Sequence, residues 1–139
     1  MPEKEKSSPD NVALLKSKEK DEPIAEFLGM KLVELKPGYA KVTMKVLPDH
    51  LNFNGLVFGG VVMSLADQAF AYGMNSLVMP SIATHFTIQL IAGAKPGDVL
   101  TAECRPLKSG RRVGFAEMTV TNQEGKLIAK ATGTTVVTG

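Results

Sequence analysis

The sequence predicts an α+β fold in which one antiparallel β-sheet curls around one long central helix. Apolar and polar residues alternate over residues 31–47 and again from residue 81 to residue 138, which is the period of half-buried strands. Between these blocks, residues 61–79 are rich in Ala, Leu and Met and contain no proline, as in a helix. Because this helix is apolar on nearly every face, we expect the sheet to bury it on most sides.

Length and composition indicate a single domain. The 139 residues carry a net charge of only +2, which argues against a nucleic-acid-binding or membrane-surface protein. One cysteine and two histidines exclude a disulfide framework and a Cys/His zinc cluster. We therefore expect a cytoplasmic protein with no metal and no cofactor. A polar, flexible segment over residues 1–21 should precede a domain over residues 22–139.

The elements before the central helix are two short helices and a hairpin. Asp10 suits the start of a first helix, although the polar run that follows argues against a long one. Pro23 suits a first helical position and Gly29 a helix end. Pro37-Gly38 is a turn signal, so residues 31–36 and 39–47 should pair as strands.

Four strands should follow the central helix. In the first of these strands, alternation from Ile82 to Leu90 includes Thr84 on the apolar face. Turns around Pro96-Gly97, Ser109-Gly110 and Gly125 then separate strands over residues 99–107, 112–121 and 126–138.

Three glycines, Gly55, Gly59 and Gly60, lie just ahead of the central helix. The first amides of a helix have no intrahelical acceptor, and glycine lets a ligand approach the backbone closely. Such a helix start suits an anion, including the oxyanion formed when a nucleophile attacks a carbonyl. The alternative is that these glycines only make a tight loop before a closely packed helix.

Asp67 is the unexpected residue of the helix, because its neighbours in the sequence are apolar. A desolvated carboxylate needs partners or a function. The structural alternatives are a hydrogen-bond anchor, for instance to Ser64, or a position on an exposed strip. As a catalytic group, Asp67 would lie about 10 Å along the helix from Gly60, too far for both to reach one carbonyl. Two antiparallel copies of the helix about a two-fold axis would close that gap, so a shared site requires a homodimer.

The chain resembles the hotdog-fold thioesterases, specifically the PaaI-like acyl-CoA thioesterases, over residues 24–139. The most specific match is NFNGLVFGGVVMSLAD, residues 52–67. The resemblance makes Asn52 the asparagine near the thioester, Gly59 and Gly60 the pair whose amide polarises the carbonyl, and Asp67 the catalytic acid. Phe58 replaces the usual histidine, and Gly93 stands where a proline is usual.

The resemblance implies hydrolysis of an aryl- or medium-chain acyl-CoA to the free acid and CoA. Asp67 of the partner would act as general base or as nucleophile, and Asn52 and Thr84 would orient the water or the thioester. A homotetramer, as a dimer of dimers, is expected. The alternatives are a non-catalytic acyl-CoA sensor on the same fold and a hotdog dehydratase, although the latter would need a histidine where Phe58 stands.

Substrate-binding candidates fall into two groups. Phe53, Phe58 and Met63 could line the acyl pocket, whereas Phe70 and Met74 should pack the core. Arg111 and Arg112 could cradle the CoA phosphates or simply form a polar hairpin tip. Outside these groups, His50 should be solvated or structural, His85 should lie on the surface, and Cys104 should pack in the core.

Overall fold

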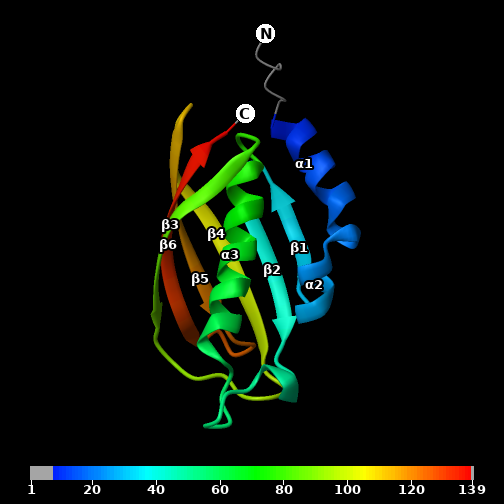
Figure 1. Cartoon of the computed structure of the whole chain (residues 1–139), viewed down its shortest axis with the longest axis vertical. Coiled ribbons are helices and arrows are strands. Elements are labelled where there is room, and N and C mark those ends of the chain that lie inside the picture. Colours follow the sequence, from blue (N-terminus) through cyan, green and yellow to red (C-terminus); the bar gives the residue numbers. More distant parts are fainter. Residues whose placement is uncertain (1–7, 139) are drawn as a thin grey trace.

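The structure is a computed structural model that describes residues 8–138 (Figure 1). One six-stranded antiparallel sheet wraps around one long helix, α3, which spans Gly59–Asn75. The predicted α+β hotdog fold is confirmed. The strands are β1 (Lys31–Lys36), β2 (Tyr39–Lys45), β3 (Ser81–Leu90), β4 (Val99–Ser109), β5 (Val113–Thr121) and β6 (Leu127–Val137).

The strands follow the order β1-β2-β4-β5-β6-β3, so β1 and β3 form the two edges of the sheet. The β1 edge is short and partly capped, because the Leu32 amide donates a hydrogen bond to the Glu19 carboxylate at 3.1 Å. The β3 edge is ten residues long and pairs only with β6 within residues 8–138. Long open edge strands tend to pair with a strand of another chain, so β3 is the edge more suited to such pairing.

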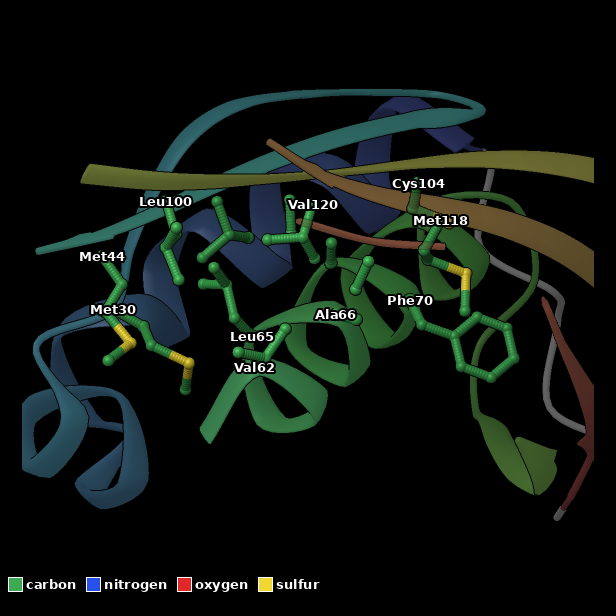
Figure 2. Close-up of a cluster of buried hydrophobic side chains, with 14 of the residues drawn as sticks. Met30, Met44, Val62, Leu65, Ala66, Phe70, Leu100, Cys104, Met118 and Val120 are labelled. Atoms are coloured by element: carbon green, nitrogen blue, oxygen red, sulfur yellow. The ribbon is translucent and has the colours of Figure 1, made fainter. Parts of the chain in front are cut away.

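The core lies between α3 and the concave face of the sheet (Figure 2). Phe70 and Met74 are fully buried there, as expected. Close approach of helix and sheet depends on two glycines: a Cβ at Gly73 would lie 2.6 Å from Cys104 Sγ, and one at Gly133 would lie 2.5 Å from the Phe70 ring. Packing this tight fixes the position of α3 along the sheet.

Two expectations about α3 were wrong. The helix ends at Asn75 instead of continuing to residue 79, because the Ser76 hydroxyl donates to Gly73 O and accepts from the Gly38 amide. It is also not buried on every side. An exposed stripe runs along α3 where the sheet leaves the helix uncovered; its residues are Gly60, Met63, Asp67 and Ala71.

The predicted face of β3 is interrupted by a bulge. Ala83 pairs with Thr135 and His85 pairs with Thr134, so Thr84 is the extra residue. A bulge shifts the alternation by one residue, and Ile82 is consequently 53% exposed instead of facing the core.

Three short helical elements precede the sheet: α1 (Ser8–Lys18), the 3-10 helix η1 (Glu19–Asp21) and α2 (Pro23–Leu28). Helix α1 is longer than the sequence suggested, and its Asn11 is fully buried, with the side-chain amide donating to Leu77 O at 3.5 Å. Residues 1–7 of the expected flexible segment lie outside the described residues. Helix α2 begins at Pro23 and ends before Gly29, which has a φ of 73°. In the described part of the chain, no helix is long and apolar enough to cross a membrane.

Candidate active site

The start of α3 presents two open backbone donors. Phe58 precedes the helix in an extended conformation and provides no side-chain cap. Within residues 8–138, the amides of Gly59 and Gly60 have no hydrogen-bond acceptor. The first turn also contains no acidic residue, so the positive end of the helix dipole has no local carboxylate opposite it. This helix start can therefore bind a developing negative charge.

Both glycines also have a packing reason to be glycine. A Cβ at Gly59 would lie 2.6 Å from Leu90 Cδ1, and a Cβ at Gly60 would lie 2.8 Å from Phe58 Cε1. The Phe58 ring therefore folds back over Gly60, and the end of β3 reaches Gly59. These glycines therefore allow tight packing at the helix start and also leave their amides open.

The side-chain oxygen of Asn52 organises the loop before α3. Asn52 Oδ1 accepts from the amides of Asn54 at 2.9 Å and Leu56 at 3.3 Å. The β5–β6 turn repeats this arrangement, because Asn122 Oδ1 accepts from the amides of Glu124 and Lys126, both at 3.0 Å. Because two backbone N–H groups fix Oδ1 as the acceptor, any role of Asn52 toward a ligand falls to its Nδ2 donor.

A cavity of about 250 Å³ adjoins Gly59 and Asn52. Its walls are mainly aliphatic, and its remaining lining residues are Leu56, Val57, Val62, Leu90, Ile91, Ala92 and Gly93. An apolar cavity with a few polar donors at one end is typical of a small-molecule site. The sequence did not single out these aliphatic residues, since neither their type nor their spacing distinguishes them from core residues.

Asp67 lies on the exposed stripe of α3, away from that cavity. In the described chain its carboxylate has no hydrogen-bond or salt-bridge partner, and desolvation raises its pKa above the usual value for aspartate. Ser64 does not anchor it, because the Ser64 hydroxyl donates to Gly60 O at 2.8 Å. Within one chain, therefore, the structure does not bring Asp67 and Gly59 together.

The other predicted binding residues are spread along the molecule. Phe53 is 97% exposed on the loop, and Phe58 and Met63 are 57% and 43% exposed. Thr84 is exposed at the β3 bulge, with its hydroxyl 3.4 Å from Thr134 O.

The two arginines lie far from the start of α3. The Arg112 carbonyl accepts from Val137, which pairs with Ser81 at the far end of β3 from Leu90. The ten residues of β3 span about 30 Å, so Arg111 and Arg112 cannot reach Gly59 of their own chain.

The histidines and the cysteine have structural surroundings. His50 is buried and its Nδ1 accepts from the Leu47 amide at 3.0 Å, whereas exposed His85 contacts Thr87 at 2.9 Å. Cys104 is fully buried, which confirms core packing, and this burial raises the pKa of its thiol to about 12. Among the described side chains, no group of His, Cys, Asp and Glu could hold a metal ion.

Comparison with known proteins identifies the family. The model of the thioesterase superfamily matches residues 54–129, which include the start of α3, Asp67 and most of the sheet. The chain belongs to the thioesterase superfamily. Its enzyme class is therefore thioester hydrolase, as the resemblance predicted.

Relatives and solved structures agree with this assignment. The acyl-coenzyme A thioesterase PaaI of Escherichia coli K12 is 35% identical over 105 residues, covering 76% of this chain and 75% of the relative. The solved E. coli PaaI structure has a TM-score of 0.87 at 30% identity and covers 95% of this chain and 94% of that one. A hypothetical thioesterase of Streptococcus pneumoniae TIGR4, solved with coenzyme A, has a TM-score of 0.81 at 31% identity, with 90% and 97% coverage. The PaaI-like hotdog resemblance is thereby confirmed.

Proposed function

We propose that this thioesterase hydrolyses aryl- or medium-chain acyl-CoA to the free acid and CoA. The observation that carries the proposal is the pair of open amides at Gly59 and Gly60 beside an aliphatic cavity. That arrangement suits a thioester carbonyl attached to an apolar acyl group. The acyl-CoA thioesterase PaaI and a neighbour solved with coenzyme A support the choice of substrate.

The active unit we propose is a homodimer. The stripe on α3 is exposed and carries Met63 and Asp67. Among residues 8–138, Asp67 has no side-chain partner and the neighbouring β3 edge has no further strand. Pairing of both features about a two-fold axis would cover them and place Asp67 of one chain opposite Gly59 of the other. Each dimer would then contain two equivalent sites.

In the proposed reaction, the Gly59 amide donates to the thioester carbonyl oxygen and stabilises the oxyanion. Such a donor is typically worth about 3 kcal/mol in the transition state. Asp67 of the partner chain removes a proton from the attacking water, or attacks directly to give an anhydride that water then opens. The C–S bond breaks, and the CoA thiolate leaves and takes up a proton. Asn52 donates to the thioester through Nδ2, and Thr84 orients the water beside Asp67.

The test is Asp67→Asn, which keeps the shape and removes the proton acceptor. We expect kcat for hexanoyl-CoA to fall about 10²- to 10⁴-fold, measured as release of free thiol. In the wild type, activity should fall as the pH decreases through the raised pKa of Asp67, because the protonated carboxyl cannot accept a proton. Undiminished turnover by Asp67→Asn would refute the assignment, and tight binding of acyl-CoA without thiol release would support the sensor instead.

The stability of the same variant separates lost chemistry from lost folding. The raised pKa means that the folded protein binds more protons than the unfolded chain between the two pKa values. Wild-type stability therefore falls as the pH rises through that window. Asp67→Asn removes this loss, so its melting temperature at pH 7 should equal or exceed that of the wild type.

A further inference from the structure

Two neighbouring cavities lie between the start of α3 and two lysines. The apolar cavity beside Gly59 and a second cavity of about 270 Å³ share the lining residues Leu56 and Gly93. The second cavity is polar, and its other lining residues are Lys95, Asp98, Asn122, Gln123, Glu124 and Lys126. In a single chain, therefore, the cavity beside the open Gly59 amide and the cavity with the charged side chains are neighbours that meet at Leu56 and Gly93.

Leu56 packs on Gly93 at the boundary between the two cavities. A Cβ at Gly93 would lie 3.1 Å from Leu56 Cδ1 and 3.2 Å from its Cδ2. The absence of a side chain at Gly93 lets the half-exposed Leu56 lie against the backbone. A larger residue at this position would push Leu56 into the adjoining cavities and narrow them.

Lys95 and Lys126 both line the second cavity together with Asp98. Asp98 is buried, and its pKa is lowered first by the hydrogen bond from Gln123, next by the Lys95 amide, and also by the charges of Lys95 and Lys126. Its Oδ1 and Oδ2 are occupied by Gln123 and the Lys95 amide at 3.0 and 3.1 Å. Neither ammonium has a carboxylate within 4.0 Å among the described residues. Both lysines are therefore free to bind an external anion.

We propose that Lys95 and Lys126 bind the phosphates of the CoA part of the substrate, while the pantetheine arm crosses Gly93. The proposal rests on the acyl-CoA activity proposed above. It differs from the assignment of the phosphates to Arg111 and Arg112, which would require the partner chain. The apolar cavity beside Gly59 adjoins a polar cavity that carries two lysines, which matches the order of acyl group, pantetheine and phosphates.

The experiment compares two substrates that differ only in the nucleotide, hexanoyl-CoA and hexanoyl-pantetheine. The double variant Lys95→Glu/Lys126→Glu should raise KM for hexanoyl-CoA roughly tenfold and leave KM for hexanoyl-pantetheine unchanged. Glu124→Gln removes the competing carboxylate from the same cavity and should lower KM for hexanoyl-CoA only. Lys16→Glu, an exposed charge reversal on α1, is the matched control and should change neither value.

Direct binding of CoA, measured by calorimetry on the same proteins, tests the lysine site separately from the proposed hydrolysis of acyl-CoA. If the wild type cleaves neither ester but binds CoA more tightly than the double variant, the lysine site stands and the hydrolase proposal fails. If both esters are cleaved but the double variant has wild-type KM and CoA affinity, the lysine site is wrong. If KM for hexanoyl-CoA rises only in Arg111→Glu/Arg112→Glu, the arginines bind the phosphates and the lysine site is wrong. A wild type that neither binds CoA nor cleaves the esters would overturn both proposals.

Discussion

The Gly59 amide can be removed without unfolding the helix, because Gly59 is the first residue of α3. Proline is tolerated at a first helical position, and Phe58 already has the extended conformation that a residue before proline prefers. Gly59→Pro deletes the N–H, whereas Gly59→Ala keeps it and introduces the same Cβ contact with Leu90. We expect Gly59→Pro to reduce kcat at least 10²-fold further than Gly59→Ala, measured as thiol release. Equal activity of the two variants would exclude this amide as the oxyanion donor.

Asn52 and Asn122 allow a structural role to be separated from a catalytic one, because the two turns have the same hydrogen bonds. Aspartate at either position retains the acceptor and removes the amide donor. With hexanoyl-pantetheine, which lacks the nucleotide, Asn52→Asp should therefore reduce kcat about 10²-fold, whereas Asn122→Asp should leave kcat for the same ester unchanged. Both variants should keep their free energy of unfolding within about 0.5 kcal/mol. Wild-type activity in Asn52→Asp would show that Asn52 only stabilises the turn and has no catalytic role.

At the scale of elements, the sequence predicted what depends on local pattern. The two-residue period located all six strands, and Pro23 and Gly29 marked the ends of α2. The same pattern could not reveal the Thr84 bulge, because one extra residue shifts a strand without changing its composition. Nor could it distinguish a helix surrounded by its own sheet from one with an open stripe, since both sequences are apolar. The aliphatic walls of the cavity were missed for the same reason.

The contact between α3 and β4 sets the distance between helix and sheet. An alanine in a helix interior usually stabilises relative to glycine, but a Cβ at Gly73 would lie 2.6 Å from Cys104 Sγ. Gly73→Ala should therefore destabilise by about 1–3 kcal/mol, as overpacked cores do. Adding Cys104→Ala removes the sulfur, so the double variant should lose less than the sum of the single losses in urea unfolding. Additive losses would contradict a direct contact.

At the scale of the whole molecule, the position of Asp67 is the main argument for the proposed homodimer. The sequence predicted that Asp67 and the helix-start glycines are too far apart in one chain, and the cavity beside Gly59 indeed excludes Asp67. The open β3 edge is a second argument for a partner chain. The alternation of apolar and polar residues could not predict this edge, because strand order depends on contacts between residues distant in the sequence. Together these features support the proposed two-fold dimer, in which each chain would complete the other's site.

Mixing two inactive variants tests this shared site directly. When Asp67→Asn and Gly59→Pro are unfolded together and refolded in equal amounts, random pairing makes about half of the dimers heterodimers. A shared site places both substitutions in one site of each heterodimer and leaves the other site intact. About a quarter of wild-type thiol release should therefore return, although each variant alone is inactive. If Asp67 and Gly59 acted within one chain, every site would carry a substitution and no activity would return. Light scattering of the same mixture establishes that the chains associate, so a failure to recover activity cannot be ascribed to monomers.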